Sequence, residues 1–379
     1  MIKILHIIPN LKKGGAERLV IDICSSLSIK NNVEVKLVYL NNEVEYDLSE
    51  LNFKAEFIPS KIELSVKKRN FYEIELLRKY IQTFKPNIIH THLFEAELIS
   101  RSIHYPHAKW FSHCHDNMIQ FLPLTLKTLL SKSSFTNFFE KKYLFKKYKE
   151  NGGTHFIAIS KHTESFFRKS QFIFPITLLN NGINLNRFKR SAEFHKETNS
   201  KIKIVNIGSF FPKKNQSLLL DIIVMLNLKG FQTETYFLGD GPTKKTVEKK
   251  ANELGISNQC HFLGNVDNVE EYLWQADFYV HTALYEPFGL VLLEAMAAEC
   301  TVICLNGGGN SDIITNKFNG FIFQEQDSEL FANALIHLKQ NIEIKNQISE
   351  NALTFIKQYD INLYTEKLLD IYLQKNNNG

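Results

Sequence analysis

Two glutamates eight positions apart carry the clearest chemical signal in this sequence of 379 residues. They bracket the stretch Glu286-Pro287-Phe288-Gly289-Leu290-Val291-Leu292-Leu293-Glu294. Pro287 and Gly289 interrupt the chain directly before an apolar helical run. This arrangement predicts that Glu286 lies on a loop and Glu294 in the second turn of a helix.

The start of that helix is a candidate anion site. The backbone N–H groups of Gly289, Leu290 and Val291 have no acceptor within the helix, and the helix dipole favours negative charge beside them. A diphosphate would dock there, with Glu294 near a ribose and Glu286 near the group that the diphosphate carries. An ordinary capped helix with two solvated carboxylates is the alternative.

Short apolar runs alternate with helix-period segments along both halves of the chain. In the first half, helices are predicted at Ala16–Leu27 and Tyr72–Phe84, and strands at Ile2–Ile8, Val33–Leu40, Asn87–His92, Lys109–His113 and Phe156–Ile159. In the second half, strands are predicted at Ile202–Ile207, Thr235–Leu238, His261–Leu263, Phe278–His281, Thr301–Leu305 and Phe321–Phe323. Strands so uniformly apolar predict parallel sheets covered on both faces.

We therefore expect an α/β protein of two doubly wound, Rossmann-like domains that face each other across a cleft. The predicted domains are residues 1–182, joined by a C-terminal crossing helix of about 362–379, and residues 183–361. The turn Asn180-Asn181-Gly182 suits a hinge because it tolerates positive φ. The tail helix, Ser349–Gln374, should break around Asp360. Ligands of this architecture bind at the carboxyl ends of the strands, so the cleft is the predicted site.

Composition excludes several classes of protein. Hydrophobic residues at 44% and charged residues at 22% are ordinary for a globular chain, and a net charge of +5 is too small for a strongly basic nucleic-acid binder. No apolar run reaches the length of a spanning helix, and the first strand does not resemble a signal peptide. Five cysteines without a Cys-x-x-Cys favour a reducing, cytoplasmic compartment. Neither a Walker A sequence nor a Gly-x-Gly-x-x-Gly is present, which disfavours NTP hydrolysis and dinucleotide chemistry.

Two His-x-His pairs, His90/His92 and His113/His115, stand at predicted strand ends, with both members of each pair on one face. Zinc ligation is one interpretation. The other is that they are core or rim histidines whose ring nitrogens bond to the backbone. The residues alone leave both open.

Further motifs follow one another along nearly the whole chain. They are Gly14-Gly15-Ala16-Glu17, Pro86-Asn87-Ile88-Ile89-His90-Thr91-His92-Leu93, Asn181-Gly182-Ile183-Asn184, Gly239-Asp240-Gly241-Pro242, Phe262-Leu263-Gly264, Ala276-Asp277 and Gly307-Gly308-Gly309. With the stretch from Glu286 to Glu294, they resemble in order and spacing the family 4 retaining glycosyltransferases, nucleotide-sugar-dependent enzymes of GT-B fold.

The resemblance implies roles in the second domain. Glu286 would hydrogen-bond the donor sugar, and Glu294 the ribose hydroxyls. Lys214 would bind phosphate. The N–H groups that follow Phe288, on Gly289, Leu290 and Val291, would hold the diphosphate.

It also implies roles in the first domain. Gly14 and Gly15 would approach the diphosphate from the opposite side, since only glycine lets the backbone come so close. His115, or failing it His113, would contact and orient the donor sugar. Glu286, His115 and Lys214 are thus the predicted catalytic residues, with His90, His92 and His113 as possible acceptor or rim contacts.

The sequence departs from the family pattern in two places. Ser209 stands where the family has an arginine, so one positive charge that would contact the leaving diphosphate is missing unless Lys213 supplies it. Asp312 stands where the family usually has glutamate. No Asp-x-Asp occurs in the chain, so we expect no metal and no cofactor beyond the donor. Lys214 and the helix N-terminus would then stabilise the leaving UDP or GDP.

The positive charge concentrates in Leu124–Lys149, where lysines alternate with aromatic residues. A basic helix with an aromatic face is typical of binding to a membrane surface. The alternative is a solvated helix whose aromatic residues line the domain core. Enzymes of the family that extend lipid-linked sugars often dock on the inner leaflet. We therefore expect a cytoplasmic protein, peripheral on the inner face of the cytoplasmic membrane, that does not bind nucleic acid.

Together these features predict a retaining, metal-independent hexosyltransferase. It would move a hexose or N-acetylhexosamine from a UDP- or GDP-sugar to a hydroxyl of a growing, lipid-linked bacterial surface glycan (capsule, exopolysaccharide or lipopolysaccharide). Two alternatives remain: a nucleotide-sugar epimerase of GT-B fold, and a non-catalytic subunit that binds nucleotide sugar.

Overall fold

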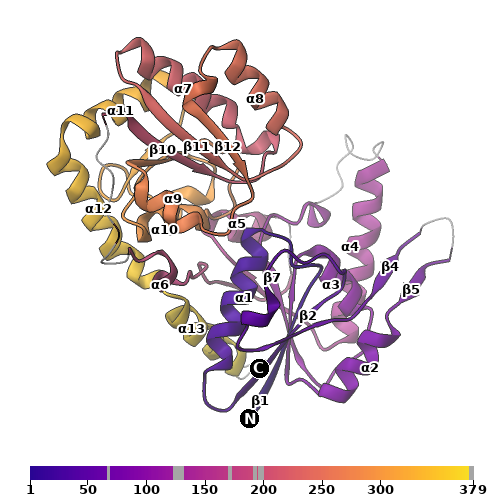
Figure 1. Ribbon diagram of the computed structural model, residues 1–379. Helices are drawn as coiled ribbons and strands as arrows, with labels where there is room; N and C mark the ends of the chain where they lie inside the picture. The colour runs from indigo at the N-terminus through magenta and orange to yellow at the C-terminus, as the bar shows by residue number, and fades with distance from the viewer. Residues whose placement is uncertain (66–68, 123–131, 170–172, 191–193, 195–199, 375–379) are drawn as a thin grey trace. The chain divides into compact units, whose positions relative to one another are not determined.

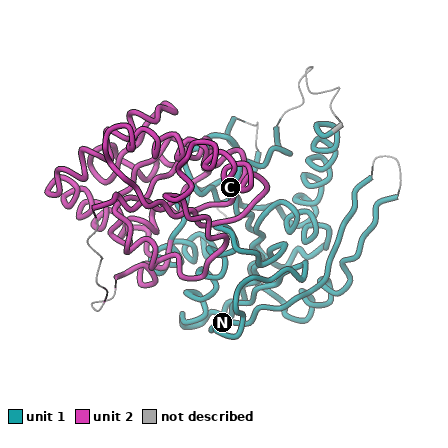
Figure 2. The backbone as a smooth tube through the Cα atoms, turned by 45° about the horizontal axis from the view of Figure 1, so that its top comes forward, with its two compact units in different colours: residues 1–182, 361–379 teal, residues 183–360 magenta. Residues whose placement is uncertain are grey.

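The computed structural model describes residues 1–65, 69–122, 132–169, 173–190, 194 and 200–374. The chain folds into two compact units (Figure 2). Unit 1 comprises residues 1–182 and 361–379, and unit 2 comprises residues 183–360. The chain thus leaves unit 1 once and returns to it. The two ends of unit 2 lie side by side, since the N–H of Ile183 donates to the carbonyl oxygen of Tyr359 at 2.8 Å.

Unit 1 is built on a seven-stranded sheet in the order β3-β2-β1-β6-β7-β8-β9, with every neighbouring pair parallel. The central strands are runs of Ile, Val and Phe buried on both faces, which is typical of parallel sheets. The strands are β1 (Ile2–Ile8), β2 (Val33–Tyr39), β3 (Lys54–Phe57), β6 (Ile88–His92), β7 (Lys109–Cys114), β8 (His155–Ala158) and β9 (Ile176–Leu178). A separate antiparallel pair consists of β4 (Lys61–Glu63) and β5 (Phe71–Glu73).

Unit 1 takes its helices from the N-terminal half of the chain and one further helix from the C-terminal segment. Helix α13 packs against α1 (Figure 1), and Ser26 Oγ lies 2.8 Å from Thr365 Oγ1 between them. The helices are α1 (Gly15–Ser28), α2 (Glu75–Phe84), α3 (Phe94–Arg101), α4 (Lys132–Glu150), α5 (Lys161–Lys169) and α13 (Ile361–Leu373), with short 3-10 turns η1 (Leu48–Glu50) and η2 (Ile119–Phe121).

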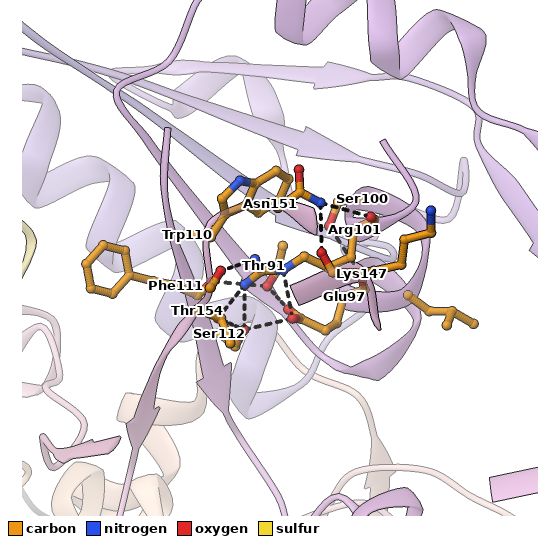
Figure 3. Close-up of polar contacts among 12 residues, drawn as sticks. Thr91, Glu97, Ser100, Arg101, Trp110, Phe111, Ser112, Lys147, Asn151 and Thr154 are labelled. Atoms are coloured by element: carbon orange, nitrogen blue, oxygen red, sulfur yellow. Dashed lines mark hydrogen bonds and ion pairs between the residues drawn. The ribbon is translucent and has the colours of Figure 1, made fainter. Parts of the chain in front are cut away.

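A buried ion pair fastens α3 to the sheet (Figure 3). Arg101 Nε lies 3.0 Å from Glu97 Oε1, and both side chains are at most 1% exposed. The hydroxyl of Ser112 donates to Glu97 at 2.8 Å, and that of Thr91 donates to the other oxygen of the same carboxylate. The guanidinium also stacks 4.4 Å from the centroid of the Trp110 ring. Because each charge has close partners, the pair ties α3 to β6 and β7.

Unit 2 repeats the architecture with six parallel strands in the order β12-β11-β10-β13-β14-β15. The strands are β10 (Ile202–Ile207), β11 (Thr233–Leu238), β12 (Cys260–Gly264), β13 (Phe278–His281), β14 (Thr301–Leu305) and β15 (Phe321–Phe323). The helices are α6 (Leu185–Phe188), α7 (Gln216–Leu228), α8 (Lys244–Glu253), α9 (Val269–Gln275), α10 (Leu290–Ala297), α11 (Ser328–Gln340) and α12 (Ile342–Ile356), with 3-10 turns η3 (Pro212–Lys214), η4 (Ser257–Gln259), η5 (Gly309–Asp312) and η6 (Lys357–Tyr359).

The predicted fold class is confirmed, because both units are doubly wound parallel sheets of Rossmann type. In each sheet the strand order reverses beside its first strand, between β1 and β6 and between β10 and β13. Ligands bind at the carboxyl ends of the strands at such reversals. The tail helix breaks at Asp360, between α12 and α13, as predicted.

One predicted helix starts in the wrong place. Tyr72 and Glu73, the first two residues of the predicted helix Tyr72–Phe84, lie in strand β5, and α2 begins only at Glu75. Aromatic residues favour a strand here, because β4 offers a pairing partner. Among the described residues, no helix is long and apolar enough to cross a membrane. All five cysteines are buried and free.

Candidate functional site

Glu286 lies on the loop after β13 and is held by a glycine turn. The N–H of Glu286 donates to the carbonyl oxygen of Gly307 at 2.7 Å, and the N–H of Gly309 donates to the carbonyl oxygen of Glu286 at 2.8 Å. A Cβ on Gly309 would collide with the backbone of Pro287, so only glycine allows this close approach. The sequence Gly307-Gly308-Gly309 therefore fixes the position of Glu286.

The carboxylate of Glu286 is buried beside two basic side chains. Lys214 Nζ lies 2.5 Å from its Oε2, and His281 Nε2 lies 3.2 Å from the same oxygen. The hydroxyl of Tyr279 lies 2.9 Å from His281 Nδ1 and 3.2 Å from the carbonyl oxygen of Ile207. Four side chains from the ends of β10 and β13 thus form one connected group at the strand-order reversal of unit 2.

The electrostatics of this group favour an ionised glutamate. Burial alone would raise the pKa of Glu286, but the charge of Lys214 and the contacts with His281 outweigh burial and lower that pKa to about 2. Burial also lowers the pKa of His281, and the carboxylate offsets this only in part. At neutral pH the group therefore consists of a carboxylate, an ammonium and a neutral imidazole.

Helix α10 starts beside this group. Gly289 precedes its first residue, Leu290, with a φ of 101° that glycine adopts without strain. The buried Oδ1 of Asn310 has no hydrogen-bond partner and lies 3.1 Å from the position of a Cβ on Gly289. Glu294 lies in the second turn, half-buried. Phe288 is buried, and its ring centroid lies 6.1 Å from that of Tyr359.

The loop after β10 carries Lys214 towards Glu286. The N–H of Leu284 donates to the carbonyl oxygen of Lys213 at 2.8 Å, which joins this loop to the Glu286 loop. The Lys213 side chain is exposed, with its Nζ 5.3 Å from the centroid of the Tyr285 ring. Ser209 is exposed as well, so the position that the family fills with arginine is open.

The predicted residues of unit 1 lie at the carboxyl ends of its strands. Gly14 is the N-cap of α1 in an extended conformation, and Gly15 is the first residue of that helix. The carboxylate of Glu17 lies against Gly14, in the space that a Cβ would need. Both glycines are exposed.

The His-x-His pairs are brought together with a fifth histidine, His6, which the sequence reasoning missed. The rings form a stack over β1, β6 and β7, with neighbouring centroids 4.3 to 5.2 Å apart. Their hydrogen-bond partners are side chains, not the backbone: Tyr372 for His90, Asn181 for His113, and both His6 and His115 for His92. The pairing register could have revealed His6, because it stands directly opposite His90.

Two family models match adjacent parts of the chain. The model described as Glycosyltransferase Family 4 matches residues 13–187, and the model described as Glycosyl transferases group 1 matches residues 188–355. The chain belongs to the family 4 glycosyltransferases.

Curated relatives of this glycosyltransferase include the capsular polysaccharide biosynthesis glycosyltransferase CapH of Staphylococcus aureus, 26% identical over 99% of both chains. The lipopolysaccharide core biosynthesis glycosyltransferase LpsE of Rhizobium meliloti is 26% identical over 45% of this chain and 48% of its own. Among solved structures, Anabaena HepE in complex with UDP and glucose aligns with a TM-score of 0.77 at 18% identity, over 98% of this chain and 99% of its own. WaaG aligns with a TM-score of 0.72 at 17% identity, over 98% and 100%. These likenesses identify the fold of the glycosyltransferase as GT-B.

The lysine-aromatic segment of the glycosyltransferase divides into two parts. Residues 124–131 lie outside the described residues. In α4, Leu144 and Tyr148 are buried in the core of unit 1, as the core interpretation of this segment predicts. Lys141 donates to the carbonyl oxygen of Phe121 at 2.7 Å. Phe135, however, is 47% exposed, and among the side chains of α4 whose burial is described the exposed lysines are Lys142, Lys146 and Lys149.

Proposed function

We propose that this glycosyltransferase moves a hexose or N-acetylhexosamine from a UDP- or GDP-sugar to a hydroxyl of a growing surface glycan, with retention of configuration. The observation that carries the proposal is the buried Lys214–Glu286 pair beside the N-terminus of α10. The setting is supported by CapH and LpsE, whose names place them in capsule and lipopolysaccharide biosynthesis, and the donor class by the complexes of HepE with UDP.

In this proposal the diphosphate binds the free N–H groups of Gly289, Leu290 and Val291. Lys214 donates to a phosphate oxygen, and it can do so without leaving Glu286 because an ammonium has three N–H donors. Glu286 accepts a hydrogen bond from a hydroxyl of the donor sugar, and Glu294 from the ribose. The positive charge of Lys214 then stabilises the negative charge that develops on the leaving UDP or GDP.

Retention follows if the leaving phosphate oxygen takes the acceptor's proton on the same face of the sugar. No protein nucleophile is then needed. The low pKa of Glu286 supports this, since a carboxylate held ionised by Lys214 is a weak base. His115 would orient the donor sugar, and Gly14 and Gly15 would serve the diphosphate. The proposed reaction uses no metal, because Lys214 and the helix N-terminus supply the charge stabilisation.

We also propose that α4 brings unit 1 to the inner face of the cytoplasmic membrane, where a lipid-linked acceptor would be available. The three exposed lysines and the exposed Phe135 support this. The buried half of the helix narrows the proposed contact to its exposed side and to its amino-terminal end.

The test is calorimetric binding of UDP, GDP and their glucose, N-acetylglucosamine and mannose conjugates, followed by product analysis. Lys214→Ala should weaken binding of the preferred donor at least tenfold. Lys229→Ala, which removes another Lys–Glu pair of unit 2 at 2.9 Å, should not. Equal binding by both variants would overturn the assignment of Lys214. An altered sugar nucleotide formed without acceptor would identify an epimerase, and binding without any turnover would identify a non-catalytic subunit.

A further inference from the structure

We propose that unit 1 contains a transition-metal site formed by His92, His113 and His115, where β6 and β7 end. This inference does not rest on the proposed function. It concerns a cation held by imidazoles of unit 1 and not the charge stabilisation of the diphosphate in unit 2.

The three rings converge. One ring nitrogen of each residue lies within 4.8 Å of the other two. His92 stands directly opposite His113 in the parallel pairing of β6 and β7, and His115 follows two positions later on the same face. His92 Nδ1 lies 3.0 Å from His115 Nε2, and the rings of His113 and His115 stack with centroids 4.3 Å apart. A His-x-His pair on one strand with a third histidine on its neighbour gives three nitrogen ligands from a rigid sheet.

Hydrogen bonds on the far side of two rings decide which nitrogens are available. Asn181 Oδ1 lies 3.3 Å from His113 Nε2, and because a carbonyl oxygen only accepts, this contact favours the tautomer of His113 with its proton on Nε2. Its Nδ1 is then a bare lone pair, and it is buried with no hydrogen-bond partner. His92 Nε2 is engaged by His6 Nδ1 at 2.8 Å, which leaves His92 Nδ1 on the side of His115.

These contacts are those that metal-binding histidines normally have. A ligating imidazole usually donates its other N–H to a neighbouring acceptor, which fixes the tautomer and ring orientation. Asn181 would be that acceptor for His113, and His6 would be that acceptor for His92. His115 is only partly buried, so it provides a route of entry and room for a further ligand.

The chemistry selects a class of metal. Three neutral imidazoles suit Zn²⁺, Cu²⁺, Ni²⁺ or Co²⁺, whereas Mg²⁺ and Ca²⁺ prefer oxygen ligands. A second trio, His6, His90 and His92, also has nitrogens within 4.8 Å of one another. It fits less well, because tetrahedral zinc with bonds of about 2.05 Å holds its nitrogens roughly 3.3 Å apart. The 2.8 Å between His6 Nδ1 and His92 Nε2 departs further from that spacing than the 3.0 Å between His92 Nδ1 and His115 Nε2.

The experiment is calorimetric titration of the full, chelator-treated chain with Zn²⁺, and with Co²⁺ as a spectroscopic probe, in the absence of any sugar nucleotide. We expect one metal per chain and visible Co²⁺ absorption bands of four-coordinate geometry. His113→Ala and His115→Gln should each weaken binding at least 100-fold, and Asn181→Ala about 10-fold or more. His107→Ala, which changes an exposed histidine of unit 1, should bind like the unaltered chain.

Because His113 is buried, each variant is checked for native circular dichroism, and His115→Gln supplies the decisive comparison if His113→Ala does not fold. Absence of stoichiometric binding would overturn the proposal. Binding that survives His115→Gln would also overturn it. If that surviving binding is lost in His90→Phe, the metal belongs to the trio His6, His90 and His92. These titrations contain no sugar nucleotide and leave Lys214 and Glu286 of unit 2 unchanged, so the failure of this inference and the failure of the proposed function are distinguishable.

Discussion

Lys214 Nζ and Glu286 Oε2 lie 2.5 Å apart in a pair whose side chains are only 17% and 12% exposed. The two residues are 72 positions apart in the sequence and come from loops that follow adjacent strands, β10 and β13. A buried charge of either sign is costly without its partner. The ammonium of Lys214 therefore keeps the carboxylate of Glu286 in its charged form.

Removing Lys214 should make unit 2 less stable in a pH-dependent way. The pKa of Glu286 is lowered from 4.5 to about 2, so the pair contributes stability above pH 4.5 that is lost as the pH falls through 2. That shift corresponds to about 3 kcal/mol at neutral pH. Urea denaturation of Lys214→Met and of the unaltered chain should differ by this order at pH 7 and by less than half as much at pH 3. Lys229→Met is the control, and a difference independent of pH would contradict the account.

The exposed Ser209 offers a gain-of-affinity test. Ser209→Arg would restore the charge that the family pattern has beside Gly208, and we expect UDP to bind about tenfold more tightly, equivalent to about 1.4 kcal/mol. If Lys213 already supplies that charge, Lys213→Ala should weaken UDP binding by a similar factor. Lys245→Ala, on the exposed side of α8, is the control. Unchanged affinity in both variants would exclude positions 209 and 213 from phosphate binding.

Membrane contact through α4 should depend on its exposed lysines. Lys142→Gln with Lys146→Gln should lower affinity for vesicles of anionic phospholipid about 30-fold, since each lysine near such a surface contributes about 1 kcal/mol. Lys141 and Lys147 are poorer choices, because they are engaged by Phe121 and Glu150. The paired change Lys245→Gln with Lys249→Gln on unit 2 is the matched control. Sedimentation with vesicles measures the effect, and equal binding by both double variants would refute the contact.

The Arg101–Glu97 pair should be structural. Arg101→Met leaves the carboxylate of Glu97 buried without its charge partner, and the free energy of unfolding should fall by about 3–5 kcal/mol. Adding Glu97→Leu to Arg101→Met removes both charges and should recover part of the loss. Chemical denaturation of the full chain measures the free energy of unfolding of both variants. A loss below about 1 kcal/mol in Arg101→Met would mean that the network does not hold α3 to the sheet.

Much of this architecture is predictable from sequence because parallel strands buried on both faces leave a strong apolar signal. The central strands of both sheets were predicted in this way. Edge strands β3 and β9 were missed, since they are short and partly exposed. Helix α2 was started too early, because a propensity argument could not include the pairing of β5 with β4.

The site was predictable where a local motif carried it. The loop position of Glu286 and the start of α10 at Leu290 followed from Pro287 and Gly289. His281 was not predicted as a neighbour of Glu286, and His6 was not grouped with the other histidines. The first contact depends on how the loop after β13 folds back to the end of that strand, where backbone hydrogen bonds with Gly307 and Gly309 hold Glu286, and the second depends on the pairing of β1 with β6. A motif search along the chain does not contain that information.

The central claim is that Glu286 binds the donor sugar during transfer, and turnover of Glu286→Ala tests it most directly. The rate of UDP or GDP release from the preferred sugar nucleotide is measured with a bacterial membrane fraction as the source of acceptor, beside the unaltered chain and Glu329→Ala, the acidic partner in the control pair. We predict a fall of about 10- to 1000-fold in Glu286→Ala and none in Glu329→Ala. Full activity in Glu286→Ala would contradict the account.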